Sequence, residues 1–232
     1  MITWKKIQGY ICSKWIKIRL KPIHVFCLHH VCAEFDRESM HECDWMQIDK
    51  FKSEIIAMQK SGVVFISLHD AYRKITKDKL RIRKYVVLTF DDGWASLNRV
   101  IPWLCEQQIP VTLFLNPAYI KGIARREIGT SLTEEELEEL LRVGNGLITI
   151  ASHGWNHTLC TEFPIPEFEE SVSKSEAYLK KYDAYIPFFA YPCGRYSSKT
   201  DECLFSNGIV PVHMDGMPNY NNRKVIHREI ID

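Results

Sequence analysis

The 232-residue chain lacks several features that mark common protein classes. No uninterrupted apolar run approaches the ~18 residues of a membrane-spanning helix. The chain has no Gly-x-Gly-x-x-Gly motif and no phosphate-binding loop, so a nucleotide-binding fold has no motif in its support. The formal net charge is only +1, which argues against a nucleic-acid partner because such proteins carry a strong basic excess.

The chain has eight cysteines but no Cys-x-x-Cys pair, so a thiolate zinc site or a thioredoxin-like motif has no support. Several cysteines lie in apolar stretches such as "VFCL" and "WLCEQ", where a free thiol behaves as a small hydrophobic group. The first residues also lack the apolar stretch of roughly 7–15 residues that an export signal contains. We therefore expect reduced thiols and a cytoplasmic location.

Residues 1–22 form a basic segment that we expect to be a separate amphipathic helix. Its apolar side chains recur at helical spacing, with cations between them: Trp4, Ile7, Ile11, Trp15 and Ile18. Such a stripe usually packs on the domain and leaves a solvated basic face. The alternative is that residues 1–21 lie on an anionic membrane surface, which would place the cytoplasmic protein at the membrane periphery.

From residue 23 onward, short apolar runs alternate with helical patterns in what we expect to be a single domain, 23–232. Strands are predicted at 24–28, 63–68, 85–90, 111–116, 147–152, 188–192 and 208–212. Helices are predicted at 49–60, 69–76, 96–107, 134–142, 167–182 and 198–206. Thr133 and Glu136 have the spacing of a capping box at the start of one of them. This alternation predicts parallel strands joined by right-handed crossovers, in a barrel or a doubly covered sheet.

Residues suited to metal binding and proton transfer follow several of the predicted strands. They are His29 and His30 after the first strand, Asp91 and Asp92 after 85–90, His153 and His157 after 147–152, and the sequence "YPCG" (191–194) after "FFA". In barrels and open α/β sheets, the carboxyl ends of parallel strands meet at one rim. The sequence therefore predicts that these side chains gather there.

Two histidines and one carboxylate make a facial ligand set that leaves positions open for water and substrate. Such a set suits Zn²⁺, Co²⁺, Ni²⁺ or Fe²⁺ better than Mg²⁺, which prefers oxygen ligands. If one aspartate binds the cation, its neighbour can stay ionised and take a proton from a water molecule whose pKa the cation lowers to about 7. An ordinary Asp-Gly turn would explain Asp92 and Gly93, but not Asp91 or the histidines.

The motifs "LTFDDG", "SHGWNH" and "FAYPCG", in this order, resemble those of the polysaccharide deacetylases of carbohydrate esterase family 4, the NodB-homology domain. "VFCLHHV" is similar to the "YHxV" opening of one subgroup, which also has a "FAYPxG" loop. The resemblance implies a distorted (β/α)7-type barrel, related to the TIM barrel, over 23–232. It also implies a hydrolase of non-peptide carbon–nitrogen bonds.

The resemblance assigns a role to each motif residue. Asp91 is the catalytic base, and Asp92, His153 and His157 hold a divalent metal, most often Zn²⁺, with cobalt, nickel or iron as alternatives. His29 is the catalytic acid, with His30 and His227 as rivals. The loop Tyr191, Pro192, Cys193 and Gly194 holds the oxyanion through the N–H of Cys193. The implied substrate is an N-acetylated amino sugar in a polysaccharide, an oligosaccharide or a lipid-linked precursor.

The chain departs from the family pattern at two positions. Ala190 stands where an arginine often orients the catalytic aspartate, and Cys193 replaces an aromatic residue. Arg228, in "HREI", is the candidate to orient Asp91 instead. The chain also has no "DxxDW"-like motif, which in the family supplies an apolar wall for the substrate. These departures leave open a catalytically weakened carbohydrate-binding protein on the same fold. A deacylase of a non-sugar amide is a further alternative, because fold and metal site do not specify the acyl donor.

The two alternatives for the N-terminal segment predict different behaviour with lipid vesicles. If residues 1–21 lie on an anionic membrane, the full chain should co-sediment with phosphatidylserine vesicles, and deletion of residues 1–21 should abolish this binding. Equal sedimentation of the two proteins, or none by either, would support packing on the domain. Vesicles of neutral phosphatidylcholine are the control.

Overall fold

The structure, a computed structural model, describes residues 23–34, 45–77, 84–162, 164–219 and 224–230. The amphipathic helix expected in residues 1–22 falls outside these ranges. Within them, no helix is long and apolar enough to cross a membrane. The six cysteines in the described ranges are all free thiols.

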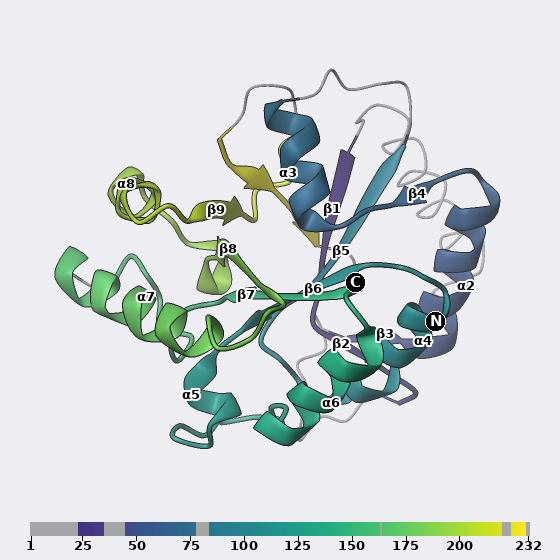
Figure 1. Cartoon of the computed structure of the whole chain (residues 1–232), viewed down its shortest axis with the longest axis horizontal. Helices are drawn as coiled ribbons and strands as arrows, with labels where there is room; N and C mark the ends of the chain where they lie inside the picture. Colours follow the sequence, from purple (N-terminus) through teal and green to yellow (C-terminus); the bar gives the residue numbers. More distant parts are fainter. Residues whose placement is uncertain (1–22, 35–44, 78–83, 163, 220–223, 231–232) are drawn as a thin grey trace, which may run out of the picture.

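Parallel strands form one large sheet at the centre of the molecule (Figure 1). Its members in chain order are β1 (Ile23–Leu28), β4 (Val64–Phe65), β5 (Tyr85–Phe90), β6 (Val111–Leu115), β7 (Ile148–Ser152), β8 (Tyr185–Ala190), β9 (Val210–His213), β10 (Ile226–His227) and β11 (Glu229–Ile230). The spatial order is β10-β9-β8-β7-β6-β5-β1-β11, and β4 pairs with β5. A separate pair, β2 (His30–Cys32) and β3 (Trp45–Gln47), makes a second small sheet.

The two ends of the sheet order are neighbours in the sequence. β10 pairs with β9, and β11, one residue further along the chain, pairs with β1. The segment 226–230 therefore bridges the two edges and nearly closes the sheet into a barrel. This is the distorted (β/α)7-type barrel in a single domain that the sequence predicted. The bridge places Arg228 between the two pairings.

Alternate residues on each strand face opposite sides of the sheet. One apolar cluster contains Val25, Val87, Phe114 and Ala190 from four different strands, together with side chains of helix α3 (Leu68–Thr76). The intervening strand residues belong to other clusters, in which they pack against the surrounding helices. Both faces are thus apolar, as expected for strands buried on both sides. The polar groups of the candidate site follow the carboxyl ends of these strands, with Asp91 after β5, Asn116 after β6 and His153 after β7.

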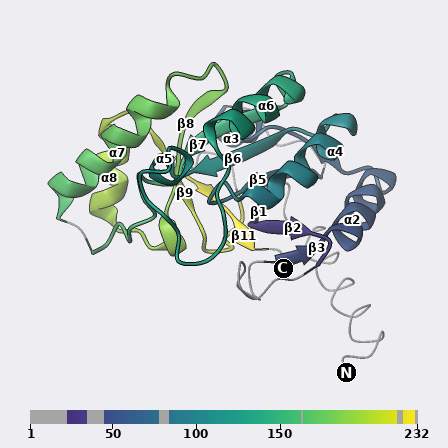
Figure 2. The ribbon, with the colours of Figure 1, turned by 90° about the horizontal axis from the view of Figure 1, so that it is seen from below.

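Helices surround the strands (Figures 1 and 2). They are α2 (Ile48–Lys60), α3, α4 (Ile101–Glu106), α5 (Pro117–Ile120), α6 (Glu134–Gly144), α7 (Ile165–Leu179) and α8 (Ser198–Ser206), with short 3-10 turns η2 (Ala95–Arg99) and η3 (Pro192–Gly194). The capping box expected at Thr133 is present: its hydroxyl accepts from the Glu136 N–H, and the Glu136 carboxylate accepts from the Thr133 N–H. The sequence prediction for α8 is confirmed residue for residue.

The structure adds short elements that the sequence did not predict, namely β2, β3, α5, β10 and β11, and it places β8 at Tyr185–Ala190 rather than at 188–192. Two of the predicted elements also differ in length or continuity. The strand expected at 63–68 is only two residues long, because Ser67 already caps α3 through its hydroxyl. The helix expected at 96–107 is divided into η2 and α4. Pro102 occupies the first turn of α4, where its missing N–H costs nothing, so a new helix begins there.

Replacing Thr133 with alanine tests the start of α6. The substitution removes the hydroxyl that accepts the Glu136 N–H, and we expect the free energy of unfolding to fall by about 1 kcal/mol in urea titrations. Ser53→Ala, on the exposed side of α2, is the matched control and should change it by less than ~0.5 kcal/mol. Equal effects of the two substitutions would contradict a capping role for Thr133.

Candidate active site

Asp91 and Arg228 form a buried ion pair at the carboxyl end of β5. Arg228 Nη1 donates to Asp91 Oδ1 at 2.6 Å, and Nη2 donates to Oδ2 at 2.8 Å. The two residues are 137 positions apart in the sequence and nearly inaccessible to solvent. Paired, parallel hydrogen bonds of this kind fix the plane of the carboxylate as well as its charge. Arg228 therefore occupies the place next to Asp91 that Ala190 left unassigned.

The surroundings of this pair keep Asp91 ionised. Burial acts to raise the pKa of Asp91, but the charge of Arg228 and the hydrogen bonds from its guanidinium outweigh it and hold the pKa well below its usual range. Burial likewise acts to lower the pKa of Arg228, and the Asp91 charge more than offsets it. The Cys27 thiol, whose pKa burial raises, donates to Asp91 Oδ2 at 3.3 Å. Asp91 thus has the charge state that a general base needs.

The backbone turns sharply at Asp92, between β5 and η2, and both aspartate carboxylates come within 4 Å of His153 Nε2. The φ of Asp92 is +70°, and Gly93 follows with a φ of +67°. A Cβ at Gly93 would lie 2.7 Å from Leu115 Cδ2, so both the conformation and the space favour glycine there. The Asp92 carboxylate accepts from Trp94 Nε1 at 3.1 Å and from Arg126 Nη1 at 3.2 Å. Each adjacent aspartate therefore has its own arginine.

His153 and His157 lie on the loop after β7, facing Asp92. His157 has a φ of +60°, so the two histidines share a tight loop, one of the two arrangements that their spacing allowed, rather than a helical turn. His157 Nε2 lies 3.4 Å and His153 Nε2 3.9 Å from Asp92 Oδ1. The Nδ1 atom of His153 lies 2.8 Å from the carbonyl oxygen of Ala190, which it can reach as a donor. That hydrogen bond leaves the lone pair of His153 on Nε2, which lies between the two aspartates, 3.8 Å from Asp91 Oδ2 and 3.9 Å from Asp92 Oδ1.

The residues Asp92, His153 and His157 fit a divalent metal. One ligand atom from each lies within 4.8 Å of the others. Burial lowers the pKa of both histidines, to about 4 for His153, so both imidazoles are neutral near pH 7, as metal ligands must be. The atoms of Cys27, His29 and Asp91 are also within 4.8 Å of one another, but there Arg228 takes both oxygens of Asp91.

His29 is the candidate acid that lies beside Asp91. It follows β1, is partly exposed, and has a ring nitrogen within 4.8 Å of the Asp91 carboxylate. The two rivals face other groups. His30 Nδ1 is 3.1 Å from Ser96 Oγ and its ring packs on Trp94, whereas His227 Nδ1 is 2.9 Å from Asp215 Oδ1.

The loop Tyr191–Gly194 borders the histidine loop. The Pro192 ring lies close to Gly154, the residue after His153: a Cβ added at Gly154 would be 3.8 Å from Pro192 Cγ. Cys193 is exposed and has a φ of +54°, and Gly194 continues with +65°. Successive residues with positive φ turn the backbone back on itself here. The loop is thus at the same rim as the metal candidates, and the donation to an oxyanion by the Cys193 N–H stays a prediction.

Sequence reasoning missed Arg126 and Asn116, which hold the metal candidates in place. Arg126 Nη2 donates to the backbone oxygen of Asp92 at 2.6 Å and to Asn116 Oδ1 at 3.1 Å, and its guanidinium packs between the rings of Trp94 and Tyr119. Asn116 Nδ2 donates to the carbonyl oxygens of His153 and Gly154. A signal for Asn116 existed, since it directly follows β6 at the same rim, but no local pattern marks Arg126.

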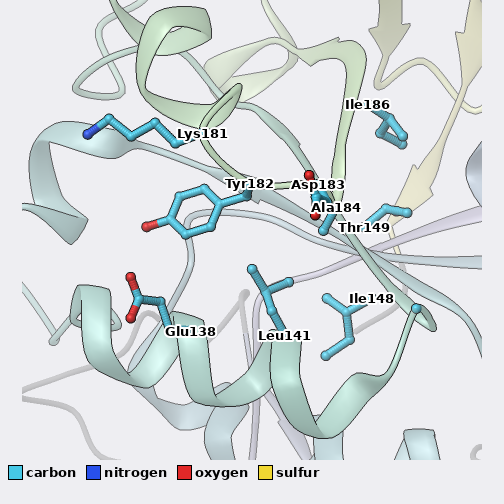
Figure 3. A pocket seen from close by; sticks show the side chains of 10 residues that line it. Glu138, Leu141, Ile148, Thr149, Lys181, Tyr182, Asp183, Ala184 and Ile186 are labelled. Atoms are coloured by element: carbon cyan, nitrogen blue, oxygen red, sulfur yellow. The ribbon is translucent and has the colours of Figure 1, made fainter.

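A pocket at the opposite ends of the strands has a different character (Figure 3). It lies between α6 and the amino ends of β7 and β8, and Glu138, Leu141, Thr149 and Tyr182 are among its lining residues. Chemistry in parallel α/β folds takes place at the carboxyl ends of the strands. This hollow is therefore separate from the candidate site.

The comparisons with known proteins agree with this geometry. A family model described as polysaccharide deacetylase matches residues 78–212, more than half of the chain. The chain belongs to the polysaccharide deacetylase family. This family consists of hydrolases that act on amide bonds, which is the enzyme class expected from the motifs. Asp91, Asp92, His153 and His157 lie inside the matched range, whereas His29 and Arg228 lie outside it.

Among curated proteins, a relative from Bacillus subtilis (strain 168) has the name "Putative polysaccharide deacetylase YxkH". It is 25% identical over 153 residues, which cover 65% of this chain and 52% of the relative. This deacetylase-family chain therefore spans about half the length of the curated relative that it matches.

Two solved structures share the fold of the deacetylase-family chain. IcaB from Ammonifex degensii has a TM-score of 0.78 at 21% identity, over 91% of this chain and 92% of that one. The Streptococcus pyogenes deacetylase PplD, in complex with acetate, has a TM-score of 0.77 at 22% identity, over 90% and 92% respectively.

Replacing Arg228 with methionine tests the buried pair. The substitution leaves the Asp91 charge buried without its partner, so we expect the free energy of unfolding to fall by about 3–5 kcal/mol in urea titrations. Adding Asp91→Asn should recover part of this loss because the unpaired charge disappears. The matched control is Arg142→Met, which breaks an exposed pair with Glu139 and should leave the unfolding midpoint unchanged. A double variant as unstable as Arg228→Met alone would contradict the pairing.

Proposed function

We propose that the chain is a metal-dependent deacetylase that removes N-acetyl groups from an amino-sugar polysaccharide, oligosaccharide or lipid-linked precursor. One observation carries this proposal: Asp91, held ionised by Arg228, lies beside a triad of Asp92, His153 and His157, of which only His157 is partly exposed. Family membership supplies the reaction class. The name of the curated relative supports a polysaccharide substrate, and that of PplD supports deacetylation.

In the proposed mechanism, each residue at this rim of the barrel has a separate role. A divalent ion held by Asp92, His153 and His157, Zn²⁺ in our proposal, would polarise the amide carbonyl and lower the pKa of the attacking water. Asp91 takes the proton of that water, and Arg228 keeps its carboxylate in one orientation. His29 gives a proton to the nitrogen of the departing amine. The N–H of Cys193 donates to the carbonyl oxygen as negative charge develops on it.

The arrangement favours catalysis over a binding role on a decayed fold. A protein that only binds carbohydrate needs no ionised aspartate that a buried arginine holds beside neutral histidines. Such a charge arrangement is typical of an active site, where burial and charged partners adjust proton affinities. A cytoplasmic location and a membrane contact through residues 1–21 also stay proposals, since those residues lie outside the described ranges.

Replacing each aspartate separately tests the assigned roles. Asp91→Asn should lower the rate of acetate release from N-acetylglucosamine oligomers by at least ~10²-fold while the triad keeps its metal, because only the base is lost. Asp92→Ala should remove both the metal of the triad and the activity. Asp49→Ala, at an exposed carboxylate on α2, is the control and should change neither.

Acetate release should be compared across N-acetylglucosamine oligomers, other acetylated sugars and simple acetamides. Release from acetamides alone would favour the non-sugar alternative. The proposed function would be refuted by a wild-type protein that binds no divalent metal through Asp92. It would also be refuted by an Asp91→Asn variant with wild-type turnover.

A further inference from the structure

A second group of histidines and carboxylates lies on the outer face of the barrel, next to α8. β9 and β10 pair in parallel with His213 opposite His227, so the two imidazoles stand side by side on the same face of the sheet. Asp215 follows β9 by two residues, and its side chain turns back toward both rings. Asp201 approaches from α8. The group combines three chain segments that are brought together only by strand pairing.

The distances within this group match those of a metal-ligand set. Asp215 Oδ1 is 2.9 Å from His227 Nδ1, and Asp215 Oδ2 is 3.9 Å from His213 Nδ1. One ligand atom from each of these residues lies within 4.8 Å of the others. Ligands about 2.0–2.2 Å from one zinc ion are separated from each other by roughly 3–3.6 Å, so only small side-chain shifts are needed. The donor set, two imidazoles and one carboxylate, again suits Zn²⁺.

A histidine that binds a metal through one ring nitrogen usually donates the N–H of the other to a carboxylate, and His213 has such a carboxylate beside it. Its Nε2 is 3.0 Å from Asp201 Oδ1, and that carboxylate accepts from the hydroxyl of Tyr191 at 2.7 Å. A hydrogen on Nε2 leaves the lone pair of His213 on Nδ1, the atom that faces Asp215. The ring of Tyr196 stacks on His213 with 3.6 Å between centroids, which fixes the ring plane.

Two carboxylates, Asp201 and Asp215, face the two histidines, so a divalent ion would balance the negative charge that they bring together. His213 and His227 are almost buried. Asp215 keeps 20% of its side chain exposed, which provides an entry path for an ion.

We propose that His213, Asp215 and His227 form a second metal site, which binds Zn²⁺ or a similar divalent transition ion, with Asp201 as the outer partner of His213. The site shares no ligand with the triad of the proposed function. Alternation along the chain separates the two: His227 faces outward, and the next residue, Arg228, faces inward to Asp91. The second ion clamps β9 to β10 and so supports the segment that holds Arg228 in place. Its role is structural.

Metal counting with matched variants tests this proposal. The full chain is stripped with a chelator, loaded with Zn²⁺, freed of unbound ion by gel filtration, and its zinc is measured by mass spectrometry. We expect two zinc ions per wild-type chain, one in Asp215→Ala, one in Asp92→Ala and none in the double variant. Asp49→Ala, which removes an exposed carboxylate, should keep two.

The outcomes separate this proposal from the proposed function. A wild-type chain with one zinc ion that Asp92→Ala removes and Asp215→Ala leaves in place would overturn the second site alone. A single ion with the opposite dependence would overturn the catalytic triad instead. If Asp215→Ala fails to fold, Asp201→Asn serves, because loss of an outer carboxylate should weaken the second ion about 10–100-fold and leave the first unchanged. Unchanged affinity for both ions in Asp201→Asn would also count against the second site.

Discussion

The ion pair between Arg228 and Asp91 is the interaction on which the site depends. It lies where the last strands join the two edges of the sheet, so the segment that nearly closes the barrel also delivers the arginine. A carboxylate buried at this depth would normally take up a proton. The guanidinium keeps it ionised and fixes its plane. The segment that closes the barrel therefore also keeps the Asp91 carboxylate ionised and able to accept a proton.

Two adjacent carboxylates can share one buried rim because each has its own cationic partner. Arg228 pairs with Asp91, and both carboxylates lie within 4 Å of His153 Nε2. Arg126 neutralises Asp92. The histidines beside it stay neutral because burial outweighs the nearby negative charges. The result is a concentrated set of ligand atoms without a large unbalanced charge.

Ala190 illustrates how a missing residue can be replaced from elsewhere in the fold. Its side chain is buried in the inner cluster and contributes no charge, but its carbonyl oxygen orients His153. The guanidinium that could have come from this strand comes from Arg228, which lies over the Phe114 ring in the same interior. Position in space, rather than position in the motif, decides which arginine reaches Asp91.

Local patterns in the sequence were sufficient for the alternation of strands and helices and for the Thr133 cap, because each depends on residues close together in the chain. The gathering of Asp91, Asp92, His153 and His157 followed from that alternation, because each of these residues comes after a strand of one parallel sheet. The motif resemblance named the family, and residues 78–212 confirm it. The motifs named Arg228 and His29 as candidates beside Asp91, and the tertiary structure places both there. Only the tertiary structure showed that Arg126 braces Asp92. It also brought His213, Asp215 and His227 together. These contacts join segments far apart in sequence, and strand register and the closing of the barrel, which no local pattern encodes, decide which of them form.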